Sequence, residues 1–296
     1  MKREALLGYF ICNGKLISTD HMDVFEKISS KSVYEIMKIK DGVPLFFDEH
    51  LERMKKSLLA FGVELNKNKE EILKEIVQLV KANQCTSINV KLVYNFIREG
   101  DSKFLVYFIE SEYPQEGSYQ RGIHTILFQG ERKNPNIKTI QDSFRERVKQ
   151  AREQEGAYEA LLVDEAGYIA EGSRSNVFFI KENTLLTPPG EKVLLGVTRN
   201  YVLKICHFLP IEVKEELIHI DHLKNIEGAF ITGTTVDILP IASIGHRILS
   251  TIENPIMKKI INTYEKEMDR DIQKRKSQLS IIYSYMRKDN ERGIKE

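Results

Sequence analysis

The spacing of apolar residues in the first part of the chain predicts strands and two helices. Four apolar-rich runs predict short strands: residues 8–12, 33–39, 88–94 and 104–109, the last two as an antiparallel hairpin joined by a charged turn. Between the second and third runs, apolar residues recur every three or four positions, the period of a helix face. The first helix is predicted to begin after Asp48. Its stripe comprises Leu51, Met54, Leu58 and Phe61; the stripe of the second comprises Ile72, Leu73, Ile76, Val77 and Val80.

A second set of elements follows the segment at 112–118, which is rich in Pro, Gly and polar residues. Helical periods begin near Asp142, near Thr198 and at Pro255. Strand-like runs are residues 123–129, 160–163, 168–170, 177–181, 212–220, 229–233 and 237–244.

We therefore predict an α/β (α+β) fold with three parts. A small α+β domain covers residues 1–116, and a larger domain covers residues 117–270. A charged helical tail covers residues 271–296.

Charge and cysteine content exclude several classes of partner. Lys plus Arg number 44 and Asp plus Glu 43, and no basic block is interleaved with aromatics, so we expect no nucleic acid partner. Cys12, Cys85 and Cys206 lack metal-ligand spacing, as do the histidines; we expect reduced thiols, a cytoplasmic location and no metal. The amino-terminal apolar run is too short for a signal peptide, and no run approaches about 18 apolar residues, so we expect no membrane partner.

Lys138 and Glu171 are candidates for cofactor chemistry. Lys138 follows Asn134-Pro135-Asn136, where an extended segment enters a helix, and Glu171 precedes Gly172 at a predicted strand end. An amine forms a Schiff base with pyridoxal phosphate, and a carboxylate keeps the ring nitrogen of that cofactor protonated. A solvated lysine and a charged turn residue are the alternative interpretations.

Three other segments offer groups to a phosphate. Gly196-Val197-Thr198-Arg199 leads into a helix, whose amides and Thr198 hydroxyl suit an anion; an ordinary Thr N-cap explains the same residues. Thr232-Gly233-Thr234-Thr235 ends a strand and offers amides and hydroxyls to a phosphate or a substrate carboxylate, the alternative being a simple turn. Arg53 lies on the flank of the first helical stripe, where it either reaches a phosphate or is solvated.

In their order and spacing, these segments resemble the class IV aminotransferases, the fold type IV group of pyridoxal-phosphate enzymes. The group includes branched-chain aminotransferases, D-amino acid aminotransferases and aminodeoxychorismate lyases. The resemblance runs from about residue 9 to 250. It rests on Val33-Tyr34-Glu35, His50-Leu51-Glu52-Arg53-Met54, Ile137-Lys138-Thr139, Tyr158-Glu159-Ala160-Leu161-Leu162, Glu171 to Phe178, Leu195-Gly196-Val197-Thr198-Arg199 and Gly233-Thr234-Thr235.

The resemblance implies two domains with the cofactor between them, and a homodimer in which the partner subunit closes part of the pocket. It implies that Lys138 is the Schiff-base lysine and proton carrier, and that Glu171 pairs with the pyridine nitrogen. The implied phosphate ligands are Arg53, Val197, Thr198 and Thr234. The implied substrate residues are Tyr34 and Thr235, joined in this chain by the pocket candidates Tyr94 and Arg98.

Three features depart from the family patterns. Ser30-Lys31-Ser32 stand where a Gly-rich lead is common. The strand with Tyr94 lacks the Arg and His of D-amino acid aminotransferases. Ser143 stands where branched-chain enzymes usually have a Tyr, five residues after the lysine.

The expected function is transfer of an amino group between an amino acid and a 2-oxo acid. The alternative is a 4-amino-4-deoxychorismate lyase, which releases pyruvate and 4-aminobenzoate and uses the same cofactor residues. The form Glu-Gly-Ser-x-Ser-Asn leans towards the D-amino acid and lyase branches. A third interpretation, a non-catalytic cofactor-binding protein, is disfavoured because both Lys138 and Glu171 are retained.

Overall fold

The computed structural model describes residues 4–28, 32–96, 102–130 and 142–292. The chain forms two compact units: unit 1 comprises Met1–Ser111 and Glu265–Glu296, and unit 2 comprises Glu112–Tyr264. The sequence analysis placed the first boundary at residue 116 and treated residues 271–296 as a separate tail. In the structure this last segment belongs to unit 1.

Unit 1 is built on a six-stranded antiparallel sheet with the order β2-β1-β6-β5-β3-β4. The long hairpin β5–β6 and strand β3 form its middle, and the hairpin confirms the pairing predicted for residues 88–94 and 104–109. The strands are β1 (Leu6–Cys12), β2 (Lys15–Ser18), β3 (Ser32–Lys40), β4 (Val43–Pro44), β5 (Ile88–Phe96) and β6 (Ser102–Ile109).

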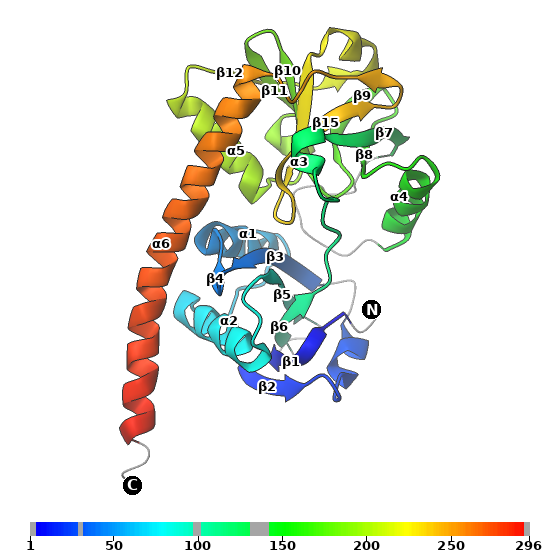
Figure 1. Cartoon of the computed structure of the whole chain (residues 1–296). Coiled ribbons are helices and arrows are strands. Elements are labelled where there is room, and N and C mark those ends of the chain that lie inside the picture. Colours follow the sequence, from blue (N-terminus) through cyan, green and yellow to red (C-terminus); the bar gives the residue numbers. More distant parts are fainter. Residues whose placement is uncertain (1–3, 29–31, 97–101, 131–141, 293–296) are drawn as a thin grey trace. The chain divides into compact units, whose positions relative to one another are not determined.

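Helices α1 (Phe47–Leu59) and α2 (Lys69–Asn83) cover one face of this sheet (Figure 1). Their predicted stripes are buried, with one exception. Phe61 lies beyond the end of α1 and is 42% exposed. The short helix η1 (Asp23–Lys27) places Phe25 against Phe10 and Tyr107. The core between helices and sheet includes Val33, Met37, Ile39, Leu51, Met54, Leu58, Ile72, Ile76, Leu92 and Val106.

The start of α1 differs from the prediction. The helix begins at Phe47, so Asp48 lies in its first turn instead of preceding it. The N-cap residue is Phe46, which has a left-handed backbone (φ 51°) and makes no side-chain cap. A carboxylate in the first turn of a helix is stabilised by the helix dipole, and Asp48 also binds cationic residues outside α1.

Unit 2 contains a mixed sheet of ten strands in the order β12-β11-β10-β14-β15-β7-β8-β9-β13, with β16 paired to β15. The predicted strand at 212–220 is two strands: β12 pairs with β11, and β13 pairs with β9. The strands are β7 (Ile123–Gln129), β8 (Glu159–Val163), β9 (Tyr168–Gly172), β10 (Asn176–Lys181), β11 (Thr184–Thr187), β12 (Glu212–Glu215), β13 (Ile218–His219), β14 (Gly228–Gly233), β15 (Asp237–Ile244) and β16 (Arg247–Ile248).

Helices pack on this sheet and complete the core of unit 2. Helix α5 contacts β14, and α4 contacts β7 and β8. Phe178 and Phe230 stack with ring centroids 5.0 Å apart in the middle of the sheet. Cys206 of α5 is buried. The helices are α3 (Ser118–Arg121), α4 (Asp142–Gln154), η2 (Gly190–Lys192), α5 (Val197–Phe208) and η3 (Ile220–Asn225).

The last helix, α6 (Pro255–Arg292), carries the predicted charged tail, but its charges are not all solvated. Arg275 is fully buried within unit 1. Its Nη2 donates to Asp48 Oδ2 at 2.8 Å, its Nη1 donates to Gln278 Oε1 at 2.8 Å, and its guanidinium lies 5.4 Å from the centre of the Phe47 ring. Asp271 accepts the Phe46 amide at 2.7 Å. These contacts fix the start of α1.

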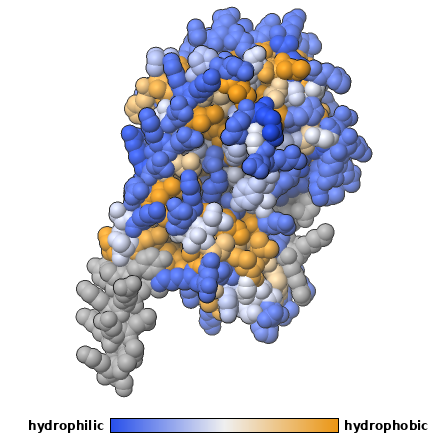
Figure 2. All heavy atoms as spheres, viewed as in Figure 1, coloured by the Kyte–Doolittle hydropathy of each residue, from blue (hydrophilic) through white to orange (hydrophobic). Residues whose placement is uncertain are grey.

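Hydrophilic residues cover most of the face seen in Figure 2, and hydrophobic residues form separate patches on it. None of the described helices combines the length and apolar character needed to cross a membrane.

We expect Arg275→Met to lower the free energy of unfolding by about 2 kcal/mol, because Asp48 then loses a hydrogen bond from a charged donor. Urea denaturation measures this change. Arg270→Met is the matched control on the same helix, since the Arg270 side chain is 75% exposed. Equal stability of the two variants would contradict the structural role of Arg275.

Candidate functional site

Glu171 lies near the end of β9, as predicted, and its side chain is only 2% exposed. Its Oε2 accepts the Leu194 amide at 3.1 Å. The following turn is tight: the Gly172 amide donates to the Ser175 carbonyl at 2.8 Å. A Cβ at Gly172 would lie 2.1 Å from Ser175 Oγ, so glycine is required there.

A second buried carboxylate, Glu159, holds this turn from β8. Glu159 is fully buried and accepts the Ser173 amide at 3.2 Å, the Ser173 hydroxyl at 2.6 Å and the Ser175 hydroxyl at 2.8 Å. The sequence analysis assigned it no role. Its position could have identified it, because Glu159 directly precedes the apolar run 160–163 and a charge in a buried strand requires partners.

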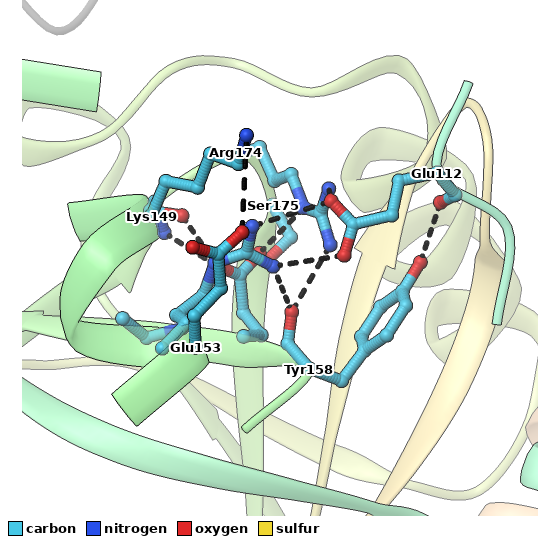
Figure 3. A network of polar contacts seen from close by, with 10 residues as sticks. Glu112, Lys149, Glu153, Tyr158, Arg174 and Ser175 are labelled. Atoms are coloured by element: carbon cyan, nitrogen blue, oxygen red, sulfur yellow. Dashed lines mark hydrogen bonds and ion pairs between the residues drawn. The ribbon is translucent and has the colours of Figure 1, made fainter. Parts of the chain in front are cut away.

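Figure 3 shows the outer side of the same turn, where Arg174 and Tyr158 face Glu112. Glu112 forms ion pairs with both Arg174 and Arg152, and the Tyr158 hydroxyl donates to the Glu112 carbonyl at 2.8 Å. Burial raises the pKa of Glu112, but hydrogen bonds from Arg174 and Arg152 outweigh burial and lower that pKa to about 2. Arg174 is thus engaged in holding the turn to the first residue of unit 2.

The start of α5 offers backbone amides to an anion. Val197 and Thr198 are 4% and 3% exposed, and the N-cap residue, Gly196, provides no side-chain cap. Thr198 is the second residue of the helix, so the alternative of a Thr N-cap is not observed. Buried amides at a helix N-terminus favour a negatively charged ligand.

Glu171 and the start of α5 are linked through one residue. The Leu194 amide binds Glu171, and the Leu194 carbonyl accepts Asn176 Nδ2 at 2.8 Å. A Cβ at Gly196 would lie 2.1 Å from Asn176 Oδ1, so this close approach also requires glycine. The carboxylate and the helix N-terminus are therefore held by one set of contacts.

Thr234 and Thr235 lie in the turn between β14 and β15, and both are half-buried. Asp237 follows with a left-handed backbone (φ 52°) and pairs with Gly233. Tyr119 Oη donates to the Val236 carbonyl at 3.1 Å. Unit 2 thus carries Glu171, the amides of Val197 and Thr198, and this turn.

Arg53 belongs to unit 1, where a buried carboxylate orients it. Its Nε donates to Glu35 Oε1 at 2.7 Å and its Nη2 to Glu35 Oε2 at 2.6 Å, while His50 Nδ1 lies 2.9 Å from Oε2. Burial raises the pKa of Glu35, but the charge and hydrogen bonds of Arg53, with those of His50, lower it to about 2. The Arg53 side chain is only 11% exposed, so it is not a solvated surface residue.

The predicted substrate residues of unit 1 lie on different faces of its sheet. Val33 pairs with Tyr94, and Tyr34 pairs with Val93. Val33 and Tyr94 share the core under the helices, so Tyr34 points to the opposite face. Tyr94 thus packs in the core, with Phe104 at 6.4 Å between ring centroids.

Tyr34 has a charged neighbour that the sequence analysis missed. Lys91 Nζ lies 4.9 Å from the centre of the Tyr34 ring, and Lys91 is 5% exposed and forms an ion pair with Glu4. A lysine within the predicted strand 88–94 is the sequence signal for it. Two predicted residues, Lys138 and Arg98, lie outside the described residues.

Comparisons with known proteins agree with the resemblance. The family model described as Amino-transferase class IV matches residues 32–244. D-alanine aminotransferase of Bacillus licheniformis is 28% identical over 242 residues, covering 77% of this chain and 84% of that protein. A probable branched-chain-amino-acid aminotransferase of Rickettsia felis is 27% identical over 286 residues, covering 89% and 97%. The crystal structure of the Escherichia coli branched-chain amino acid aminotransferase has a TM-score of 0.75 at 21% identity, covering 89% of this chain and 95% of that chain, and has the same fold.

The low pKa of Glu35 predicts a loss of stability in acid. A carboxylate whose pKa is lowered on folding from 4.5 to about 2 stabilises the folded state above the higher value, and this contribution disappears as pH falls towards the lower one. The shift corresponds to about 3 kcal/mol. We expect wild type to be more stable than Glu35→Gln above pH 4.5. This difference in unfolding free energy should fall by about 3 kcal/mol as the pH is lowered from 4.5 to about 2.

Urea denaturation at a series of pH values measures this difference. Glu52→Gln is the control, because Glu52 lies next to Arg53 on α1 and its side chain is 62% exposed. If the difference in unfolding free energy between wild type and Glu35→Gln does not vary with pH, the contacts with Arg53 do not lower the pKa of Glu35.

Proposed function

Because this chain belongs to the class IV aminotransferase family, we propose that its site residues act as the resemblance implies. The protein is a pyridoxal-phosphate-dependent enzyme that transfers an amino group between an amino acid and a 2-oxo acid. When bound, the cofactor supplies an electron sink for the charge that forms at the substrate α-carbon. The residues of the chain bind the cofactor, keep its ring protonated and move the proton.

The observation that carries the site proposal is the burial of Glu171. A buried carboxylate is unfavourable unless it is hydrogen-bonded and faces a cation. The Leu194 amide supplies a hydrogen bond, and a protonated ring nitrogen is a suitable cation. We therefore assign to Glu171 the role of keeping that nitrogen protonated.

Within unit 2 we assign the cofactor phosphate to the amides of Val197 and Thr198, at the buried start of α5, and to the hydroxyl of Thr234. A helix dipole and a hydroxyl suit a dianion. The resemblance implies Arg53 as a further phosphate ligand, and within unit 1 Glu35 holds its guanidinium in place.

We propose that Lys138 would hold the cofactor through its amine and would move the proton at the substrate α-carbon. Tyr34 and Thr235 are proposed to face the substrate. Tyr94 is not included, because it packs in the core of unit 1. We also propose a homodimer in the cytoplasm, a location that suits the three free cysteines.

A half-reaction screen tests the function and defines the substrate. The protein is mixed with single amino acids, and conversion of the bound cofactor to its amine form is followed by absorbance. The names of the relatives suggest two series, one starting with D-alanine and one with L-leucine, L-valine and L-isoleucine. Release of 4-aminobenzoate from aminodeoxychorismate without conversion would instead identify a lyase.

We expect the wild type to show a visible absorbance band from bound pyridoxal phosphate, and Lys138→Ala to lack it, because the band requires the Schiff base. A spectrum of each purified protein is sufficient. Lys149→Ala is a suitable control, since Lys149 lies exposed on α4. A colourless wild type after incubation with the cofactor would contradict the proposal.

We expect Glu171→Gln to bind the cofactor but to lower turnover at least about 100-fold, because a neutral amide does not hold the ring nitrogen protonated. Steady-state kinetics and the visible spectrum measure the two effects separately. Glu165→Gln, at an exposed turn residue of the same hairpin, is the control. Normal turnover in Glu171→Gln would exclude this role.

A further inference from the structure

We propose that Glu159 is a positioning residue, which holds the Glu171 side chain in place and thereby sets how tightly the ring nitrogen of the cofactor keeps its proton. The proposal rests on the role assigned to Glu171 above, and it concerns residues of unit 2 only. Glu159 begins β8, and Glu171 lies near the end of β9. The two residues are connected through the turn at residues 172–175, called the serine turn below.

The fully buried Glu159 carboxylate accepts hydrogen bonds from both serines of this turn. Its Oε1 accepts the Ser173 hydroxyl at 2.6 Å and the Ser173 amide at 3.2 Å, and its Oε2 accepts the Ser175 hydroxyl at 2.8 Å. The Ala160 amide donates to Oε1 at 2.9 Å and so orients the carboxylate itself. Because a buried carboxylate has lost its water, releasing any of these donors is unfavourable.

The serine turn is joined directly to Glu171, because Gly172 is the next residue of the chain. The Gly172 amide donates to the Ser175 carbonyl at 2.8 Å, which closes the turn. An ideal Cβ placed on Gly172 would lie 3.1 Å from Glu159 Oε2, so the carboxylate packs against the Gly172 backbone. A movement of Glu159 or of its serine partners therefore displaces the backbone next to Glu171.

The ladder between β8 and β9 changes register at Glu171. Val163 pairs with Ile169, whereas Leu161 pairs with Gly172. Two residues of β9 therefore stand opposite one residue of β8, and Glu171 is one of these two. A bulge of this kind directs a side chain away from the regular alternation and interrupts the ladder hydrogen bonds beside it. The regular ladder thus does not fix Glu171, and the contacts on either side of the bulge must do so.

Two anchors hold Glu171 in this bulge. The Leu194 amide binds its carboxylate at 3.1 Å, and the serine turn, through Glu159, holds the backbone that follows it. The strength of a hydrogen-bonded ion pair depends on the separation and direction of its two groups. A loosely held carboxylate therefore favours the protonated ring nitrogen less than one in a fixed position. In this way Glu159 controls the proton affinity of a nitrogen that it does not touch.

The test measures the protonation of the ring nitrogen directly. The full-length protein is loaded with pyridoxal phosphate that is isotopically labelled at this nitrogen, and the NMR chemical shift of the nitrogen is followed as a function of pH. Glu159→Gln keeps the size of the side chain but replaces one acceptor oxygen with an amide NH₂ group, which accepts no hydrogen bond. We expect the ring nitrogen in this variant to hold its proton about tenfold less tightly than in the wild type, the effect of one hydrogen bond.

A double variant tests whether Glu159 acts through Glu171. In Glu171→Gln the ring nitrogen has lost its charged partner, so the exact position of residue 171 no longer determines how tightly the proton is held. Adding Glu159→Gln to Glu171→Gln should then change the proton affinity by less than about twofold. A second tenfold loss in this background would show that Glu159 acts independently of Glu171, and it would overturn the proposal.

Ser175→Ala is a second variant, which leaves Glu159 in place and carries the test if Glu159→Gln does not fold. It removes the hydroxyl that donates to Glu159 Oε2, and we expect the ring nitrogen to hold its proton about three- to fivefold less tightly. Glu75→Gln is the matched control, because Glu75 is 6% exposed, belongs to unit 1 and binds Lys67. It should change the proton affinity by less than about twofold, even where it lowers stability.

The outcomes separate this proposal from the role of Glu171 itself. If Glu171→Gln leaves the proton affinity of the ring nitrogen as in the wild type, both fail. If Glu171→Gln lowers this affinity but Glu159→Gln and Ser175→Ala do not, the role of Glu159 alone is overturned. Urea denaturation gives the stability of each variant. A loss of stability in Glu159→Gln with an unchanged ring nitrogen would show a purely structural role and would also overturn the proposal.

Discussion

Buried carboxylates require hydrogen-bond donors, and this requirement organises both units. Glu159 is fully buried and obtains its donors from Ser173 and Ser175, which shapes the turn after Glu171. In unit 1, Glu35 obtains its donors from Arg53 and His50. Each carboxylate has donors that compensate for its loss of water. In each case the donors include, or lie next to, a residue of the proposed site.

These contacts explain how unit 2 holds its site residues. The Leu194 backbone binds Glu171 on one side and Asn176 on the other, just before α5 begins. Two glycines, Gly172 and Gly196, permit the close approach of backbone to side chains there. The end of β9, the turn that follows Glu171 and the start of α5 are therefore held together by connected hydrogen bonds. Such a site loses little conformational freedom when a ligand binds.

Helix α6 shows how a charged segment contributes to a folded structure. The sequence predicts a charged helical tail over residues 271–296. In the structure Arg275 is fully buried, Asp271 binds the Phe46 amide, and Leu279 lies in the core of unit 1. The same helix begins in unit 2, where the Tyr264 hydroxyl donates to Asp237. Composition describes the exposed face of this helix, and packing determines the rest.

The sequence by itself determined the local elements, the family and the chemical types of the site residues. Hydrophobic periods depend on neighbours a few positions apart, so they predicted most strands and the buried stripes of α1 and α2. Only the tertiary structure decided what depends on distant residues. Sheet register placed Tyr94 in the core and Tyr34 on the other face. Asp48 and Arg275, 227 positions apart, met through folding, as did Glu159 and the serines of the turn. A sequence pattern specifies which side chains prefer burial, and packing specifies which partners they find there.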